Sequence, residues 1–534
     1  MLKIFLDLSI IFCYFKPMNT NTSSLFKAVE KVNNSTFTEN GDETFKSTLD
    51  ACLDLFYHGP DFRKNTNSEE FYRHIVKSYN ESPINTLRIL AYLRDFRDKA
   101  GQGERDVFRK GLEIFINFDE EMVISSGIIP LIPFYGRWDD VFYLIGKSNK
   151  IDTLIYEIIS KQFIEDCDAY TEGKSVSLLA KWLPSVNTSS KKTVALAKKI
   201  IKALGVSEKS YRKTLSKLRD HINILEKKLS NNQFDFDYST LPSRAKMIHS
   251  GCGKVFNRKD NERYSKHVSD LANAIKNGSN DVKTNVKALY PYEIIKSVRE
   301  NRYRNDEDTA SLMDSSWKSL PNYFDDSSSK KNWLAVVDNS GSMTMGNGQA
   351  INVAISLGVY IAERNTGIFK NQMITFSAIP HFLTLNDAWN ITEKVNYILR
   401  REIIENTNLR AVFDLVLKAA VEHKISVEEM PEAIVIISDM QFDSGAVGDT
   451  SKSTHNYIKR KYTEAGYPVP KLVYWNASAY YRPNVPVTKD VNGVVLVGGC
   501  KPGMFEQILR SKSPVDFMLD VINSERYFLI KNSV

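Results

Sequence analysis

The chain has 534 residues, of which 42% are hydrophobic and 25% are charged, and its formal net charge is +7. This composition is typical of globular proteins, and the length exceeds one hydrophobic core, so we expect two or three domains. The five cysteines are dispersed and form no Cys-x-x-Cys pair. That pattern excludes a disulfide framework or a cysteine-based zinc module, and it favours a reducing, intracellular compartment.

The chain begins with an apolar stretch over residues 2–15. The stretch is too short to span a bilayer as a helix, and Asp7 interrupts it. No small-residue cleavage site follows, which argues against a secretory signal, and Met18 is an alternative start. Residues 19–45 are rich in Asn, Ser and Thr. We therefore interpret residues 1–45 as a flexible N-terminal extension, and we predict a cytoplasmic protein without membrane association.

Residues 46–305 carry a helical pattern. Apolar residues recur at steps of three and four, as in the run Leu215, Leu218, Ile222, Leu225 and Leu229. Short turns that contain Gly or Pro separate such segments. Successive helix pairs of this kind predict an all-α helical-repeat domain, although no regular internal period is present.

Positive charge is concentrated in the second half of this region. Residues 191–306 hold 26 Lys and Arg against 12 Asp and Glu, a net charge of +14, so the rest of the chain is at −7. Such an asymmetry favours a surface that binds nucleic-acid phosphates, and the alternative is the solvated face of ordinary amphipathic helices. The candidate phosphate contacts are Lys191, Lys192, Lys198, Lys199, Arg212, Lys213, Lys217, Arg219, Arg244 and Lys246.

Residues 306–331 are acidic and rich in serine, and we interpret them as a linker. Beyond them, over residues 332–534, strand-like runs alternate with helix-like runs. The expected strands are residues 334–338, 372–377, 433–439, 472–476 and 493–499. This alternation predicts an α/β, doubly wound domain, with a mostly parallel sheet that helices cover on both faces. The whole chain is thus predicted to be multidomain.

Two of these strands are expected to end on an aspartate. Asp338 follows the first strand, and the turn after it places hydroxyls at Ser340 and Ser342. Asp439 ends the third strand. Ligands of doubly wound sheets bind beyond the carboxyl ends of the strands, and oxygen ligands suit a hard cation such as Mg²⁺ or Mn²⁺. The sequence therefore predicts a metal site at this edge of the sheet.

Three different roles for Asp338 fit the sequence less well. An isolated Asp-x-Ser-x-Ser is commonly a helix cap or a turn. Phosphatases with an aspartyl nucleophile usually carry a second Asp where Ser340 stands. The segment from Gly341 to Gly348 has no Gly-Lys-Ser/Thr ending, so it is not a phosphate-binding loop.

The spacing from Asp338 to Ser342 resembles the metal-ion-dependent adhesion motif of von Willebrand factor A domains. Thr407 and Asp439 follow in the order that this family's pattern requires. The resemblance implies that Asp338, Ser340, Ser342, Thr407 and Asp439 bind one divalent cation. It also implies that an open coordination position accepts a carboxylate from a protein partner.

A second resemblance covers roughly residues 46–530. Residues 93–106, which include Gly101-Gln102-Gly103-Glu104-Arg105, resemble a signature of the Ro autoantigen (TROVE) family, and residues 132–140 resemble another. Further blocks, such as residues 181–185, are similar to an uncharacterised relative of that family in giant DNA viruses, plants and bacteria. The resemblance implies a ring of helical repeats closed by an A-type domain. It also implies that the partner is RNA, single-stranded or misfolded.

Taken together, these features predict a non-enzymatic RNA-binding protein of the ribonucleoprotein type with a metal-ion-dependent adhesion site. If the protein is viral, we expect it in the host cytoplasm. The alternative is a protein-interaction scaffold that uses the metal site without RNA. A metal-dependent hydrolase is disfavoured, because no nucleophile or base accompanies Asp338 in the sequence.

Overall fold

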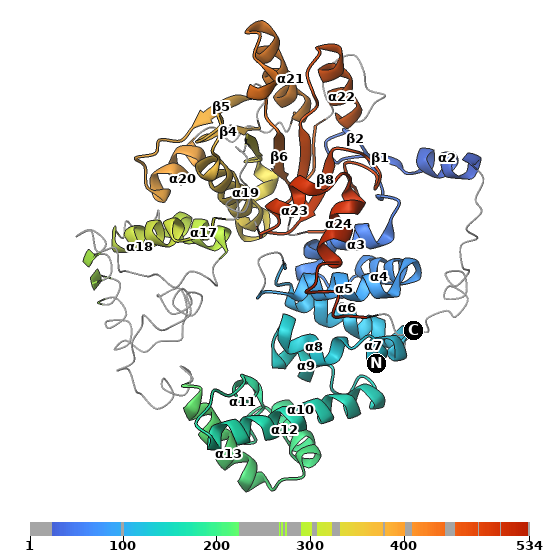
Figure 1. Cartoon of the computed structure of the whole chain (residues 1–534), viewed down its shortest axis with the longest axis vertical. Coiled ribbons are helices and arrows are strands. Elements are labelled where there is room, and N and C mark those ends of the chain that lie inside the picture. The colour runs from blue at the N-terminus through green and yellow to red at the C-terminus, as the bar shows by residue number, and fades with distance from the viewer. Residues whose placement is uncertain are drawn as a thin grey trace.

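The computed structural model shows a column of helices joined to an α/β sheet (Figure 1). It describes residues 24–97, 101–223, 266, 269–270, 273–274, 290–301, 307–322, 332–376, 380–400, 408–443, 454–478, 480–501 and 503–531. No helix in these ranges is both long and apolar enough to cross a membrane.

The N-terminal half is helical, as predicted. The helices are α2 (Ser24–Asn33), α3 (Ala51–His58), η1 (Gly59–Lys64), α4 (Glu69–Glu81), α5 (Pro83–Arg94), α6 (Arg105–Phe118), α7 (Glu120–Ser125), α8 (Ile128–Tyr135), α9 (Trp138–Tyr143), α10 (Asn149–Thr171), α11 (Leu179–Trp182), α12 (Lys191–Leu204) and α13 (Glu208–His221). Serine side chains cap the first turns of α4, α5, α10, α12 and α13, because their hydroxyls accept backbone N–H groups that lack intrahelical partners. From α3 onward the helices pack on near neighbours and lead away from the sheet to α10–α13 (Figure 1).

The C-terminal half contains the predicted parallel sheet. Its strands are β3 (Trp333–Val337), β4 (Gln372–Thr375), β5 (His381–Thr384), β6 (Ala433–Ser438), β7 (Lys471–Asn476) and β8 (Val494–Gly498). The order is β5-β4-β3-β6-β7-β8, and all neighbours are parallel except the edge strand β5, which is antiparallel to β4. The five expected strands are confirmed within one or two residues at their ends, and β5 was not expected.

Helices cover both faces of this sheet. They are α19 (Met345–Arg364), α20 (Ile391–Arg400), α21 (Leu409–Glu422), α22 (Thr454–Glu464), α23 (Phe505–Arg510) and α24 (Pro514–Ile522). Alternate residues of β3 face opposite sides, so Trp333 joins the core under α19, α20 and α24, whereas Leu334 joins the core under α21 and α22. Every residue of β3 and β6 is buried, which accounts for their continuous apolar runs.

The prediction that residues 1–45 form a flexible extension is wrong for residues 24–45, which the structure describes. Strands β1 (Ser35–Phe37) and β2 (Glu43–Phe45) form an antiparallel pair that lies against the sheet domain. The Thr38 hydroxyl donates to the Phe442 carbonyl at 2.6 Å, and Phe45 exchanges backbone hydrogen bonds with Val485. The prediction of flexibility rested on the polar composition of the segment. Composition does not reveal that these polar groups hydrogen-bond with residues far along the chain.

The expected linker over residues 306–331 is also wrong in part. Helix α18 (Glu307–Lys318) fills its first half, and α17 (Pro291–Asn301) precedes it. Both helices pack on the sheet domain, α17 on α19 and α20, and α18 on α20. Trp317 is buried, and its indole N–H donates to Glu363 of α19 at 2.6 Å. The domain boundary expected at residue 305 therefore lies between α17 and α18, two helices that pack on each other and on the same domain.

The helical column and the sheet share one hydrophobic core, which joins residues of α3 and α5 to residues of β8 and α24. At the carboxyl end of β7, the Asn476 amide donates to Asp61 of η1 at 2.9 Å. After α24 the chain returns to the column, where the Arg88 guanidinium donates to the Ile530 carbonyl at 3.0 and 3.1 Å. The carboxyl ends of β7 and β8 therefore lie against the helices.

Candidate metal centre at the carboxyl edge of the sheet

The two predicted aspartates lie at the point where the strand order reverses. Strands β3 and β6 are adjacent and parallel, with Val337 opposite Ile437. Asp338 directly follows β3, and Asp439 directly follows β6. From β3 the chain proceeds to β4 on one side, and from β6 it proceeds to β7 on the other. This switch point is where doubly wound sheets place their ligands.

Asp338 is fully buried, and its carboxylate accepts a hydrogen bond from the turn that follows it. Its Oδ1 accepts the Ser340 backbone N–H at 2.9 Å, and its Oδ2 accepts the Ser438 hydroxyl at 2.6 Å. Burial and the nearby Asp439 carboxylate raise the pKa of Asp338 to about 6. A bound cation would offset both effects, because it compensates the desolvation of the anions and their mutual repulsion.

The two serine hydroxyls of the motif face each other. Ser340 Oγ and Ser342 Oγ are 3.1 Å apart, and Ser340 is buried. Ser342 lies in η4 (Gly341–Thr344), a turn that brings its hydroxyl back toward Ser340. The predicted spacing therefore places two neutral oxygen donors beside the Asp338 carboxylate.

Asp439 is held in a strained turn. Its neighbour Met440 has φ of 64°, a left-handed conformation that costs about 1–2 kcal/mol for a residue with a Cβ atom. The Met440 backbone N–H donates at 3.0 Å to the Ser438 hydroxyl that also binds Asp338. Strain of this kind clusters at functional sites, and here it lies next to the buried Asp439 carboxylate, whose charge acts on Asp338.

The donor set fits Mg²⁺ or Mn²⁺. Two carboxylates and two hydroxyls are hard oxygen ligands, and the buried Asn339 side-chain oxygen has no hydrogen-bond partner among the described residues. Thr407, the fifth predicted ligand, lies outside the described residues, just before the Asn408 cap of α21. The structure thus brings four of the predicted positions to one edge.

Sequence reasoning missed two groups at this edge. The Ser438 hydroxyl, one residue before Asp439, donates to Asp338. Arg482 lies beside Asp439, with its Nη2 3.6 Å from Asp439 Oδ2. Ser438 is a polar residue at the end of an apolar strand and directly precedes Asp439, so the sequence could have indicated that it belongs to the site. Arg482 stands in an irregular segment after β7, and nothing in the sequence indicates its neighbours.

The predicted RNA-binding residues are distributed over α12 and α13. The exposed ones are Lys191, Lys192, Lys198, Lys199, Arg212, Lys213 and Lys217, and none of these forms a salt bridge with a described carboxylate. Arg219 points inward and donates to the carbonyls of Ala180 and Leu183, which favours a structural role. Arg244 and Lys246 lie outside the described residues.

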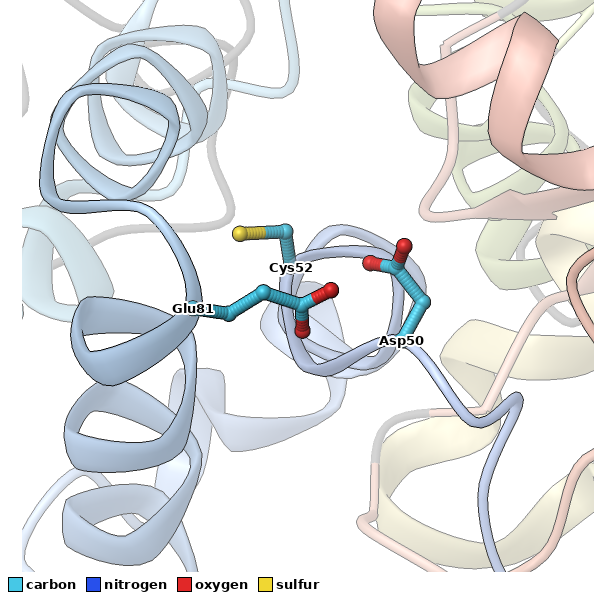
Figure 2. A group of neighbouring side chains, drawn as sticks. All are labelled: Asp50, Cys52 and Glu81. Atoms are coloured by element: carbon cyan, nitrogen blue, oxygen red, sulfur yellow. The ribbon is translucent and has the colours of Figure 1, made fainter. Parts of the chain in front are cut away.

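Another cluster of acidic and thiol side chains, at the start of α3, was not predicted. Asp50, Cys52 and Glu81 place one potential metal ligand each within 4.8 Å of one another (Figure 2). Asp50 caps α3 by accepting the Leu53 N–H, and Glu81 accepts the Ala51 N–H. Burial raises the pKa of the Cys52 thiol to about 12, so the thiol stays protonated. These contacts account for the cluster as the cap of a helix N-terminus.

Comparisons with known proteins match almost the whole chain. A domain of unknown function, DUF2828, matches residues 38–113 and 153–329, and a second, DUF7788, matches residues 332–525. The uncharacterized protein L728 of Acanthamoeba polyphaga mimivirus is 30% identical over 526 residues, which cover 92% of this chain and 87% of that protein. In this chain the DUF2828 match precedes the DUF7788 match, and the chain belongs to the giant-virus family of this mimivirus protein.

Proposed function

We propose that the protein is a non-enzymatic binding protein whose sheet domain holds one divalent cation, Mg²⁺ or Mn²⁺, and uses it to bind a carboxylate of a partner. The observation that carries this proposal is the meeting of Asp338 and Asp439 with the Ser340 and Ser342 hydroxyls at the switch point of the sheet. The resemblance to von Willebrand factor A domains supports it. Thr407 would supply the fifth ligand.

The aspartates and the serines of the proposed site have different roles. Asp338 and Asp439 supply the negative charge, and the Ser438 hydroxyl keeps the Asp338 carboxylate in place. The Ser340 and Ser342 hydroxyls are neutral donors, so the bound cation would keep part of its charge for an anionic group. Among the described residues, no His, Cys or Lys side chain hydrogen-bonds with these side chains, so we assign them to cation binding.

Metal binding tests this proposal. The purified protein should bind one Mg²⁺ or Mn²⁺ per chain, and saturating metal should raise its melting temperature, because only the folded state holds the site. Ser342→Ala should weaken binding, and Asp439→Ala should abolish it, while both variants stay folded. Isothermal titration calorimetry and melting curves in metal or chelator measure these effects.

The control is Glu429→Gln, which removes an exposed acid of η5 (Val427–Glu429), just before the amino end of β6. It should bind metal like the wild type. A wild-type protein that shows no metal dependence, with an Asp439→Ala variant that behaves identically, would contradict the metal site.

A second candidate function is RNA binding by the helical column. The observation that favours it is the set of exposed cations on α12 and α13, which have no described carboxylate partner. The resemblance to the Ro autoantigen family supports the same partner. On this view the protein is a viral component of the host cytoplasm and a ribonucleoprotein subunit. A scaffold that binds only proteins is the alternative.

A further inference from the structure

The turn between β1 and β2 lies against the loop that carries Asp439. The Asn40 amide donates to the Gln441 carbonyl at 2.8 Å, and the Gln441 side-chain oxygen accepts the Glu39 backbone N–H at 2.9 Å. The Gln441 side-chain nitrogen donates to Asn484 at 3.3 Å. Gln441 therefore joins the hairpin, the loop after β6, and the segment that contains Arg482.

Arg482 lies between two carboxylates in this arrangement. Its Nη1 is 2.7 Å from Glu39 Oε2, and its Nη2 is 3.6 Å from Asp439 Oδ2. The Glu39 side chain is 70% exposed, whereas the Asp439 side chain is 4% exposed. The shorter contact is thus to the carboxylate that water reaches, and the longer one is to the candidate metal ligand.

A divalent cation and Arg482 would use the same carboxylate. Each would neutralise Asp439, and together they would repel each other at a partly desolvated edge, where charges interact more strongly than in bulk water. The contact with Glu39 draws the guanidinium toward the solvent side and away from Asp439. A loss of this contact would leave both guanidinium edges free to pair with Asp439.

We infer that Arg482 competes with the divalent cation for Asp439, and that Glu39 restrains Arg482, so that the N-terminal hairpin sets the metal affinity of the C-terminal sheet. This inference rests on the metal site proposed above. Arg482 is a positioning residue in it and not a metal ligand. The consequence is specific: a residue near the N-terminus should change metal binding only through an arginine more than 400 positions away.

Titration of Mg²⁺ alone into the full chain tests this inference with three variants: Arg482→Gln, Glu39→Gln, and both together. Arg482→Gln should lower the dissociation constant roughly tenfold, the order expected when one adjacent positive charge is removed. Glu39→Gln should raise the dissociation constant, because it frees Arg482 to pair with Asp439. The double variant should have the same dissociation constant as Arg482→Gln, because Glu39 acts on the metal site only through its contact with Arg482.

The control is the exposed pair Lys418 and Glu422 at the end of α21, where the chain leads to the amino end of β6. Glu422→Gln and Lys418→Gln should leave the Mg²⁺ affinity unchanged, and melting curves in chelator should show that all variants are folded. This control separates the pairing with Asp439 from the effect of net charge.

The possible outcomes distinguish the metal site itself from the competition by Arg482 and from the restraint by Glu39. If the wild type binds Mg²⁺ and Arg482→Gln binds it equally well, the competition is wrong and the metal site stands. If Glu39→Gln weakens binding as much in the Arg482→Gln background as in the wild type, Glu39 does not act through Arg482. Binding that appears only in Arg482→Gln would support the competition. If no variant binds Mg²⁺, the metal site fails and the inference fails with it.

Discussion

Replacement of Asp140 by alanine should destabilise the protein by about 3–5 kcal/mol, because it leaves buried arginine charge without a partner. Asp140 is fully buried at the start of α9, where its carboxylate accepts the Arg94 Nε–H at 2.8 Å and the Arg109 Nε–H at 2.6 Å. It also accepts the Arg137 backbone N–H at 2.9 Å. One carboxylate thus joins α5, α6 and α9.

The matched control is Asp139→Asn, one residue earlier. Asp139 is partly exposed and, among the described residues, forms one salt bridge, to Arg109 at 2.7 Å, so its replacement should cost clearly less than that of Asp140. Urea denaturation followed by circular dichroism measures both effects. Equal midpoints for the Asp140→Ala and Asp139→Asn variants would contradict the view that Asp140 holds the column together.

Replacement of Lys191, Lys192, Lys198 and Lys199 by glutamine should weaken RNA binding strongly at low salt. Each lysine that neutralises a phosphate releases a counterion, so the slope of log affinity against log salt should flatten by roughly 0.7 per lysine on single-stranded RNA. The loss should be similar for different RNA sequences, because phosphate contacts do not read bases. Single-stranded or misfolded RNA should bind better than regular duplex. Chelator should have little effect, because the metal centre belongs to the sheet.

A control variant removes the same charge elsewhere. It replaces lysines that already pair with carboxylates: Lys296, Lys318, Lys418 and Lys489. Fluorescence anisotropy with labelled RNA at several salt concentrations compares the two variants. Equal affinity of the wild type and the Lys191 group variant would exclude these lysines. If the wild type itself does not bind RNA at low salt, the protein-scaffold function is favoured instead.

The sheet was predictable from the sequence because its central strands are buried on both faces. The runs 333–337 and 433–438 are almost entirely apolar, so their ends, and the aspartates beyond them, could be placed within one residue. The reversal of strand order between them then brings Asp338 and Asp439 together. The Ser340 and Ser342 hydroxyls lie close to Asp338 in sequence, so local spacing sufficed for them.

The parts that the sequence did not predict depend on distant partners. Strands β1 and β2 are short and polar, and the sheet-domain partners of this hairpin lie 404 residues later for Thr38 and Phe442 and 441 residues later for Thr44 and Val485. Helix α18 did carry a buried stripe at Met313, Ser316 and Trp317, but its many acidic and serine residues suggested a linker. Composition averages over both faces of a helix, and therefore it hides a narrow apolar stripe.

The attachment of the N-terminal hairpin to the sheet has a consequence for synthesis on the ribosome. Thr38 leaves the ribosome 404 residues before Phe442, its hydrogen-bond partner. At about 5–20 residues per second, the hairpin must wait roughly 20–80 s for the surface on which it pairs. During that time its strand edges are open to other nascent chains. The hairpin is thus made long before it can complete its contacts, and we expect the yield of native protein to depend on how well the cell shields that segment during translation.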